Sequence, residues 1–200
     1  MNIDFYKEWA ENINNPEDIK PKGFEAQIKY DIEFLKKFAD QNKVLLDLGA
    51  GTGSTINHLV NDFKKIIAIE KFKEFSKFID KRIDVLNADL NEIMKLPKVD
   101  IITAFGVFNH FNDLQIYNLY NKVFNSLNDN GIFIIKHAMG IEKDILYKKN
   151  NYWAIYRKLT KEIEFLINSN FSILEINNIY NDKYKKEEIN YFVIVGRKNG

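Results

Sequence analysis

One stretch of the sequence decides the fold class: Val44-Leu45-Leu46-Asp47-Leu48-Gly49-Ala50-Gly51-Thr52-Gly53-Ser54. It begins as a short apolar run, which indicates a buried strand, and continues into a turn with three glycines. Glycine lets the backbone turn sharply and lets a ligand approach where a Cβ would collide. In an open α/β sheet, the turn at the carboxyl end of the first strand is a place where ligands bind. The stretch therefore predicts an α/β domain with a ligand at this turn.

Apolar runs and helix-like spacings alternate along the middle of the chain. Strands are predicted at 44–48, 66–69, 83–86, 99–105 and 132–135. Helices are predicted at 54–63, around Phe72, Phe75, Phe78 and Ile79, and around Ile116, Leu119, Tyr120, Val123 and Leu127. The last helix is expected to end in the turn 128–131. Strands that alternate with helices form right-handed βαβ units, so the sequence predicts a doubly wound, mostly parallel sheet covered on both faces.

The two ends of the chain differ from this middle part. Residues 1–40 are expected to form an N-terminal helical cap, with Phe24, Ile28, Ile32 and Leu35 on one face of a helix. After a helix near 159–167, the strand-like runs 171–179 and 190–195 are joined by a polar segment, 180–188. That segment is too short for a crossover helix, so the two strands should pair antiparallel. Without an internal repeat or linker, 1–200 is predicted to be a single domain.

Composition argues against several classes of protein. Of the 200 residues, 46% are hydrophobic and 28% charged, which favours neither disorder nor a membrane protein. The first residues lack the basic flank and apolar stretch of a secretion signal, and no cysteine is present. We therefore expect a cytoplasmic protein without a bound metal. The net charge of +1 argues against a nucleic-acid substrate, because a large phosphate footprint needs an excess of Lys and Arg.

The spacing of the glycines distinguishes between cofactors. A dinucleotide fingerprint is G-x-G-x-x-G, and counted from Gly49 its third glycine would fall on Ser54. The observed pattern is G-x-G-x-G, with Asp47 two residues before it. An acidic side chain so near the turn repels a pyrophosphate and attracts a cation. Since S-adenosylmethionine carries an α-ammonium and a sulfonium and has no phosphate, the residues favour it over a dinucleotide.

The stretch from Asp47 to Gly53 resembles the first motif of the class I S-adenosylmethionine-dependent methyltransferases, and the resemblance covers about residues 40–137. In that family an acidic residue after the second strand binds the ribose hydroxyls, and Glu70 matches it. Another acidic residue after the third strand lies beside the adenine, and Asp89 matches it. The family's seven-stranded sheet ends in an antiparallel hairpin, as predicted here.

The resemblance implies one set of cofactor-binding residues and S-adenosylhomocysteine as the product. The set is Asp47, Gly49, Ala50, Gly51, Gly53, Glu70, Asp89, Leu90 and Phe105. Competing interpretations stay open for its members. The glycines can form a purely structural turn, the two aspartates can cap local backbone, and the glutamate can be an ordinary solvated residue.

Two histidines are the candidate catalytic residues. Methyl transfer requires an acceptor held in line and, for a hydroxyl, a base that removes its proton. His110 follows the fourth strand, in a stretch similar to the aromatic-and-histidine segment of many small-molecule methyltransferases. His137 directly follows the fifth strand and is expected to point to the cleft. The competing interpretation for His110 is a histidine bonded to local backbone, and His58 is expected to be a surface or packing residue.

The connection after the fifth strand is longer than a bare loop needs, so residues 138–158 are a candidate substrate lid. Tyr152, Tyr156 and Arg157 are predicted to bind the acceptor, with Arg157 facing an anionic group. The alternative is that this segment packs a helix onto the sheet.

The predicted function is methyl transfer from S-adenosylmethionine to a small-molecule acceptor, for example a hydroxyl of a sugar, a sugar nucleotide or another metabolite. The sequence lacks the Asp/Asn-Pro-Pro-aromatic motif of amino-methylating DNA enzymes, the acidic cluster of metal-dependent catechol-type enzymes and the paired glutamates of arginine methyltransferases. Three alternatives stay open: a non-catalytic S-adenosylmethionine-binding protein, an RNA methyltransferase and a nucleotide-dependent oxidoreductase. The oligomeric state is not predicted.

Overall fold

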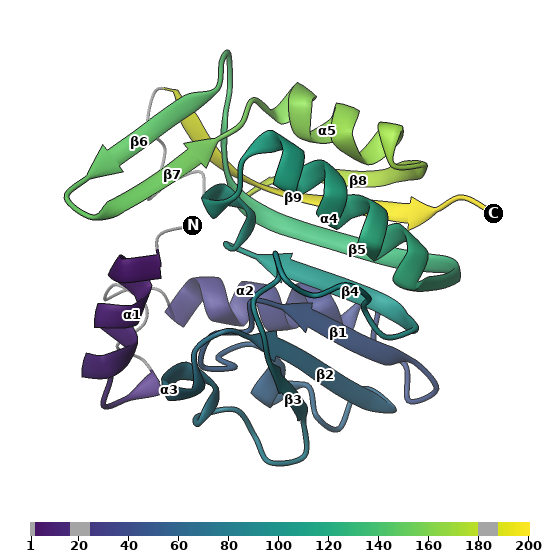
Figure 1. Cartoon of the computed structure of the whole chain (residues 1–200). Helices are drawn as coiled ribbons and strands as arrows, with labels where there is room; N and C mark the ends of the chain where they lie inside the picture. Colours follow the sequence, from purple (N-terminus) through teal and green to yellow (C-terminus); the bar gives the residue numbers. More distant parts are fainter. Residues whose placement is uncertain (1–2, 17–24, 180–187) are drawn as a thin grey trace. The chain divides into compact units, whose positions relative to one another are not determined.

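The structure is a computed structural model that describes residues 3–16, 25–179 and 188–200. The chain divides into two compact units, residues 3–93 and 94–200, which are described here one at a time (Figure 1). That the whole of 1–200 forms one domain stays a prediction.

The first unit contains a three-stranded parallel sheet. Its elements are α1 (Ile3–Asn12), α2 (Glu25–Lys36), β1 (Val44–Leu48), η2 (Ile56–His58), β2 (Lys65–Glu70), α3 (Lys73–Ser76) and β3 (Asp84–Asn87). The strand β2 lies between β1 and β3 and pairs parallel with both. Leu45, Leu46 and Leu48 of β1 are all fully buried, so both faces of this strand are covered, as expected of a parallel sheet.

The two N-terminal helices are present, but the buried positions differ in part from those expected. In α2 the buried residues are Gln27, Asp31, Phe34 and Leu35, whereas Ile28 and Ile32 are only half-buried. Phe24, which was expected on the same face, lies outside the described residues. Ala10 of helix α1 and Ile13 just after it pack onto Phe75 of α3, with Tyr6 and Trp9 against the same cluster. A role of residues 1–40 as a cap stays a prediction.

The prediction of a helix at 54–63 is wrong, because only the short 3₁₀ turn η2 forms there. Past Asn57 the bonds are of the i→i−3 type: the His58 amide donates to Thr55 O and the Leu59 amide to Ile56 O. The side chain of Asn57 is committed to backbone outside the segment, since it donates to Phe78 O at 3.0 Å and accepts from Asp80 N at 2.9 Å. The residue at the N-cap position, Thr55, makes no capping bond. The segment therefore lacks the signals that start and extend an α-helix.

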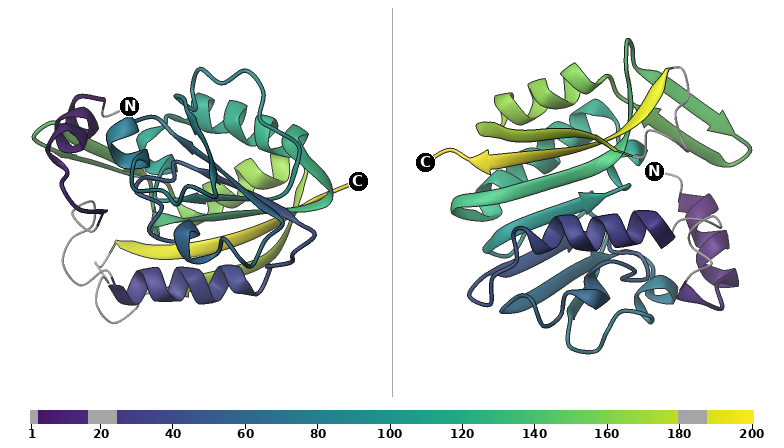
Figure 2. Two further views of the ribbon diagram at one scale, coloured as in Figure 1. Left: turned by 90° about the horizontal axis from the view of Figure 1, so that it is seen from below. Right: turned by 180° about the vertical axis from the view of Figure 1, so that it is seen from behind.

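The second unit contains four strands of one sheet and a separate hairpin. Its elements are β4 (Val99–Phe105), η3 (Phe108–His110), α4 (Asp113–Ser126), β5 (Leu127–Gly140), β6 (Ile145–Lys149), β7 (Tyr152–Tyr156), α5 (Leu159–Asn168), β8 (Phe171–Ile179) and β9 (Ile189–Lys198). Here β4 pairs parallel with β5, while β9 pairs antiparallel with both β5 and β8. Helices α4 and α5 lie on the same face of these strands (Figure 2).

Together the units supply the seven strands of the expected fold, three in the first and four in the second. The antiparallel pairing of β8 with β9 confirms the predicted C-terminal hairpin, although the connecting segment 180–187 lies outside the described residues. The fold class, a doubly wound and mostly parallel sheet with an antiparallel C-terminal hairpin, is confirmed. Helix α4 begins with a capping box, in which Asn112 accepts from the Gln115 amide at 2.9 Å and Gln115 accepts from the Asn112 amide at 2.9 Å.

The strand β5 is much longer than the predicted 132–135 and runs from Leu127 to Gly140. It absorbs the turn predicted at 128–131, where Asn130 has φ 59°. Its far end is extended by pairing with β9, from Ile132 opposite Arg197 to Gly140 opposite Ile189. His137 therefore lies within a paired strand and does not follow the end of one.

The candidate lid 138–158 contains a β-hairpin, because β6 and β7 pair antiparallel as a separate two-stranded sheet. Its role as a lid stays a prediction. Among the helices of the described residues, none is long and apolar enough to cross a membrane.

Candidate functional site

The glycine turn after β1 has the backbone that its sequence requires. Gly49, Gly51 and Gly53 have φ values of 72°, 57° and 74°, in the left-handed region that side chains with a Cβ avoid. The turn is fixed to the end of β2, because the amides of Gly49 and Ala50 donate to Ile69 O at 2.8 and 3.1 Å. The turn therefore holds its shape through bonds within the protein itself.

Gly53 also has a packing role. A Cβ at this position would lie 2.6 Å from Asn57 Oδ1 and 3.0 Å from Ile79 Cγ1. The Asn57 side chain has little freedom to move away, because it bonds the backbone of Phe78 and Asp80. Gly53 is thus required by structure, whatever else it contacts.

Glu70, the last residue of β2, is joined to the glycine turn. Its Oε2 accepts from the Gly51 amide at 2.9 Å and its Oε1 accepts from the Phe72 amide at 2.9 Å, and the residue is 7% exposed. Burial raises the pKa of this carboxyl, although the two amides act in the opposite direction. The amide of Lys71 acts on the same carboxylate, which keeps acceptor capacity for a hydroxyl group. This geometry fits the ribose of S-adenosylmethionine and disfavours the interpretation of Glu70 as a solvated residue.

Asp47 and Asp89 differ in their surroundings. Asp47 is buried within β1, opposite Ala68. Asp89 follows β3 and accepts from Lys71 Nζ at 2.7 Å and from the Asn91 amide at 2.9 Å. Burial raises the pKa of Asp89, but Lys71 and Asn91 outweigh it and hold the pKa below its usual range. The Asn91 bond is a local capping contact, so the competing interpretation of Asp89 stays open beside its role at the adenine. Leu90 next to it is buried.

Phe105 belongs to the second unit, where it ends β4. Its ring lies 4.8 Å from Lys136 Nζ, and the Gly106 amide donates to Lys136 O at 2.7 Å. Gly106 has φ 74°, so the backbone bends sharply at the end of this strand as well.

His110 lies in η3 and is held by the β6–β7 hairpin. Its Nδ1 is 3.1 Å from Trp153 O, and its ring meets Tyr152 edge to face at 5.5 Å between centroids. A carbonyl can only accept, so Nδ1 carries the proton and Nε2 has the lone pair. Burial lowers the pKa of His110 to about 4, and the imidazole is therefore neutral at pH 7. The backbone partner is 43 residues away in sequence, so the bond is a tertiary one and not the local bond of the competing interpretation.

His137 lies away from any surface, which differs from the expectation that it points to a cleft. It is 1% exposed, and its ring packs edge to face on Phe108 at 6.4 Å. Its Nε2 is 3.3 Å from Glu162 Oε1 in α5, without the alignment of a hydrogen bond. Because β5 continues past residue 135, the side chain turns into the packing between this strand and α5. An acceptor has no access to it in this conformation.

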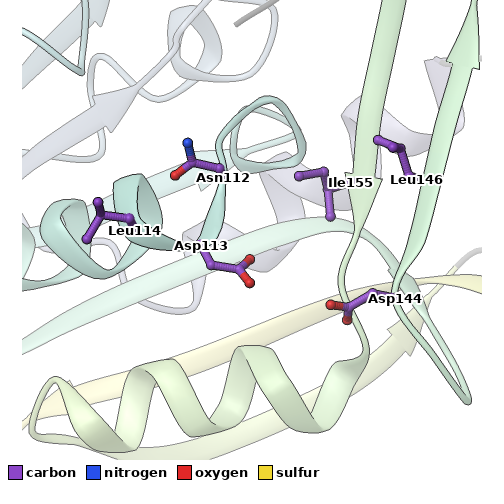
Figure 3. A pocket seen from close by; sticks show the side chains of 6 residues that line it. All are labelled: Asn112, Asp113, Leu114, Asp144, Leu146 and Ile155. Carbon is purple, nitrogen blue, oxygen red and sulfur yellow. The ribbon is translucent and has the colours of Figure 1, made fainter.

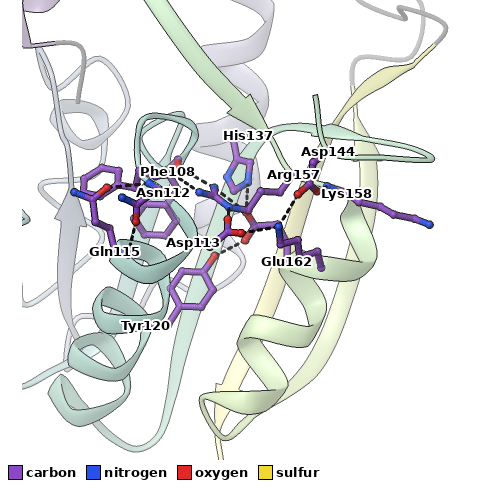
Figure 4. A network of polar contacts seen from close by, with 12 residues as sticks. Phe108, Asn112, Asp113, Gln115, Tyr120, His137, Asp144, Arg157, Lys158 and Glu162 are labelled. Carbon is purple, nitrogen blue, oxygen red and sulfur yellow. Dashed lines mark hydrogen bonds and ion pairs between the residues drawn. The ribbon is translucent and has the colours of Figure 1, made fainter. Parts of the chain in front are cut away.

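Arg157 also differs from its expected position. It was expected to face an anionic group of the acceptor, but it is 0% exposed and its guanidinium is bonded within the protein. Its Nε donates to Asp113 Oδ1 at 2.8 Å and its Nη1 lies 3.5 Å from Glu162 Oε1 (Figure 4). A buried guanidinium needs such partners because the cost of its desolvation is large. The charge of Arg157 is thus already balanced.

Tyr152 and Tyr156 lie on one face of the hairpin, together with Tyr147. Tyr147 pairs with Ala154, so it shares a face with the tyrosines two residues to either side of that alanine. The Tyr147 ring centroid lies 6.0 Å from that of Tyr152 and 6.1 Å from that of Tyr156. All three are half-buried, and the buried ring of His110 lies against Tyr152.

The other face of the hairpin borders an open hollow of about 520 Å³, shown in Figure 3. It is lined by Asn112, Asp113, Leu114, Asp144, Leu146 and Ile155. Both carboxylates are paired with Lys161, at 2.6 Å for Asp113 and 2.5 Å for Asp144. The two carboxylates thus share one lysine, and the hollow presents no cation that could bind an anionic acceptor. The tyrosine face, with its aromatic rings, is the better candidate for acceptor binding.

Sequence reasoning missed Glu162 and Tyr120. Glu162 of α5 is fully buried and accepts from Tyr120 Oη at 2.7 Å. The sequence did hold one signal. Glu162 stands at a position that shares a helix face with Leu159 and Leu166, where an apolar residue would be expected. Elsewhere in the described residues, no group of three His, Cys, Asp or Glu could hold a metal ion.

A family model described as a methyltransferase domain matches residues 24–165, which is more than half of the chain. The chain belongs to this methyltransferase family. The expected resemblance to the class I S-adenosylmethionine-dependent methyltransferases is therefore confirmed, and S-adenosylmethionine is the cofactor. That the glycine turn and Glu70 bind it stays a prediction. Among curated proteins, the methyltransferase is similar to the uncharacterised protein MJ1252 of Methanocaldococcus jannaschii, with 30% identity over 106 residues. The match spans 53% of this chain and 41% of the relative, so less than half of that protein's length is covered.

Solved structures share the fold of the methyltransferase at low sequence identity. One is a 1,6-didemethyltoxoflavin-N1-methyltransferase of Burkholderia thailandensis, solved with 1,6-didemethyltoxoflavin and S-adenosylhomocysteine. Its TM-score to this chain is 0.78 at 16% sequence identity, and the match covers 100% of this chain and 87% of that one. Another is a putative S-adenosylmethionine-dependent methyltransferase of Listeria monocytogenes, with a TM-score of 0.70 at 15% identity, covering 88% of this chain and 100% of that one. At these identities the likeness concerns the fold.

Proposed function

We propose that this chain transfers the methyl group of S-adenosylmethionine to a small-molecule acceptor in the cytoplasm. The observation that carries the proposal is the contact of Glu70 with Gly51. It ties a buried acidic side chain to a turn of left-handed glycines, at the place where the ribose is proposed to lie. Membership of the methyltransferase family supports the same reaction.

The reaction is an in-line displacement. Bound S-adenosylmethionine would supply an electrophilic methyl group and leave as S-adenosylhomocysteine, as the acceptor forms its new bond to carbon and the C–S electron pair returns to sulfur. The chain's own residues bind and orient the reactants. If the acceptor is a hydroxyl, its proton must also leave, and neutral His110 has the Nε2 lone pair that could take it. His137 is not proposed for this role, because it is buried against α5.

The acceptor is proposed to be uncharged. The expected contact of Arg157 with an anionic group has no support, since this guanidinium is balanced by Asp113 and Glu162. The half-buried rings of Tyr147, Tyr152 and Tyr156 suit the apolar or aromatic surface of a metabolite. A sugar hydroxyl or a flat heterocycle therefore fits better than a sugar nucleotide. The similar enzyme of Burkholderia thailandensis, with 1,6-didemethyltoxoflavin bound, is consistent with a small acceptor.

The test is formation of S-adenosylhomocysteine by the purified chain with a panel of acceptors. The panel contains uncharged sugars, aromatic heterocycles, sugar nucleotides and total RNA. Turnover is expected with an uncharged small molecule. Turnover with RNA alone would select the RNA methyltransferase. Binding of S-adenosylmethionine without turnover on any acceptor would select the non-catalytic binding protein.

The role of His110 is tested with the acceptor that the panel identifies. His110→Asn should lower kcat about 10²- to 10⁴-fold, the usual contribution of a positioned base, and leave the Kd for S-adenosylmethionine unchanged. His58→Asn is the matched control, since His58 is exposed and lies in the first unit. An unchanged kcat in His110→Asn would remove His110 from the chemistry.

A further inference from the structure

Arg157 joins several segments of the second unit at one point. It follows β7 directly and precedes α5, and among the fully buried side chains it is the largest. Its own carbonyl accepts from the Gly140 amide at 2.8 Å, at the end of β5. Its guanidinium reaches Asp113, the first residue of α4, and Glu162 of α5 (Figure 4). One side chain thus connects the hairpin to both helices.

The same guanidinium holds both ends of η3, the turn that carries His110. Its Nη1 donates to Phe108 O at 3.2 Å, and its Nη2 donates to Phe111 O. These carbonyls lie on either side of His110 in sequence. A planar guanidinium with five N–H groups can bond both of them while Nε bonds Asp113, whereas a lysine ammonium on a flexible stem has no such fork.

Two further bonds complete the support of η3. Asn109 Nδ2 donates to Ala138 O at 3.0 Å, and His110 Nδ1 donates to Trp153 O at 3.1 Å. The second bond forms only if η3 and β7 keep their relative position. Arg157, directly after β7, adds side-chain bonds to the carbonyls at both ends of η3 and so helps to hold the His110 ring against the Trp153 carbonyl.

The charge of Arg157 is kept in place by Glu162. This carboxylate is fully buried and accepts from Tyr120 Oη at 2.7 Å, with His137 Nε2 3.3 Å away. Burial would raise the pKa of Glu162, but His137, Arg157 and Tyr120 outweigh it and hold the pKa below its usual value. Buried charges are costly compared with apolar packing, so such a set contributes more to a defined geometry than to stability.

We infer that Arg157 is a positioning residue, which fixes η3 against β7 and thereby holds His110 as the Nδ1–H tautomer with its lone pair on Nε2. The inference rests on the proposed role of His110 in acceptor deprotonation. The arginine itself contacts neither cofactor nor acceptor. It acts through the carbonyls of Phe108 and Phe111.

The first test is ¹⁵N NMR of histidine-labelled protein, which distinguishes the two tautomers of each ring. The chain has three histidines, so the signals can be assigned with single His→Asn variants. In the unaltered protein, His110 is expected as the Nδ1–H form. In Arg157→Lys, which keeps the charge beside Glu162, a substantial fraction of Nε2–H form should appear at His110, while His58 stays unchanged. The matched control is Arg197→Lys, an exposed arginine of β9 that should leave all three signals unchanged.

The second test is kinetic. Arg157→Lys should lower kcat about 10- to 100-fold, as expected when a catalytic group is misplaced by about 1 Å, with the KM for S-adenosylmethionine unchanged. A residue that merely stabilised the unit would lower the melting temperature and leave both the tautomer and kcat of the folded protein as they were. That result, or an unchanged His110 signal in Arg157→Lys, would overturn the inference.

If Arg157→Lys does not fold, Asp113→Asn takes its place, because Asp113 is a partly exposed residue that bonds the Arg157 guanidinium. It should shift the His110 tautomer in the same direction by a smaller amount, and an unaltered His110 would again overturn the inference. The NMR measurement needs no acceptor. Absence of turnover in the unaltered protein would therefore count against the proposed function alone, while the tautomer still decides the role of Arg157.

Discussion

Replacing Gly53 by alanine tests the geometry of the glycine turn. At φ 74° an alanine costs about 1–2 kcal/mol in the folded state, and about 0.4–1 kcal/mol of that is recovered because the unfolded chain loses freedom. The new Cβ would lie 2.6 Å from Asn57 Oδ1, so the Asn57 side chain must move. Moving it breaks its bonds to Phe78 O and Asp80 N, at about 0.5–1.5 kcal/mol each. Gly53→Ala should therefore destabilise the first unit by about 2–4 kcal/mol.

Gly106→Ala is the matched comparison. Gly106 also has φ 74°, but a Cβ there meets nothing within 4 Å. Only the cost of the left-handed backbone remains, so the free energy of unfolding of Gly106→Ala should fall by about 1 kcal/mol. The difference between the two variants reports the contacts of the new Cβ with Asn57 and Ile79. In an Asn57→Ala background the closer of these contacts is gone, so Gly53→Ala should cost clearly less there than in the unaltered protein, with the contact to Ile79 as the remainder.

The assay is urea unfolding followed by fluorescence. The chain has two tryptophans, so a Trp153→Phe background makes the signal report the first unit, which contains Trp9 and Gly53. A Trp9→Phe background makes it report the second unit, which contains Trp153 and Gly106. Equal losses of stability for Gly53→Ala and Gly106→Ala would refute the reasoning. A Gly53→Ala cost that persists unchanged without Asn57 would refute it as well.

Three further predictions concern buried polar groups. Glu70→Gln places an amide against two backbone N–H donors, so the affinity for S-adenosylhomocysteine should fall about 10- to 100-fold by calorimetry; an unchanged affinity would contradict the ribose role. His110 has a folded pKa of about 4, below the ordinary 6.5, so below pH 6.5 the unfolded state binds more protons and stability falls as the pH is lowered towards 4. Unfolding measured between pH 7 and 4 should lose roughly 3 kcal/mol more in the unaltered protein than in His110→Gln, and parallel curves would contradict the shift. Tyr120→Phe removes the hydroxyl that donates to Oε2 of buried Glu162 and should cost about 1.5–3 kcal/mol in urea, whereas Tyr117→Phe, at an exposed position, should cost almost nothing.

The parts of the fold that could be predicted are those set by local sequence. The strand 99–105 was predicted with its observed bounds, because a mostly apolar run begins after Lys98 and ends before Gly106. The glycine turn and Glu70 followed from spacing along the chain, since both lie at the ends of adjacent parallel strands. The segment 54–63 was mispredicted as a helix because the bonds of Asn57 to Phe78 and Asp80, over twenty residues away, are invisible in a local pattern.

The second unit shows where sequence reasoning fails for the site. The length of β5 depends on its pairing with β9, more than fifty residues later, so the local pattern could not show that His137 lies inside a strand. The burial of Arg157 likewise depends on partners from α4 and α5, and a lone arginine after aromatics looks the same whether it faces a ligand or a buried glutamate. Tyr152 and Tyr156 were predicted as one group, and their shared face follows from hairpin pairing. Their binding of an acceptor stays a prediction.

The measurement that tests the central claim most directly is calorimetric titration of the purified chain with S-adenosylmethionine, S-adenosylhomocysteine and NAD, repeated with Glu70→Gln. The account predicts that the first two ligands bind, that NAD does not, and that the substitution weakens both binding events. Binding of NAD, or equal affinity for S-adenosylhomocysteine with and without the Glu70 carboxylate, would contradict the assignment of the glycine turn.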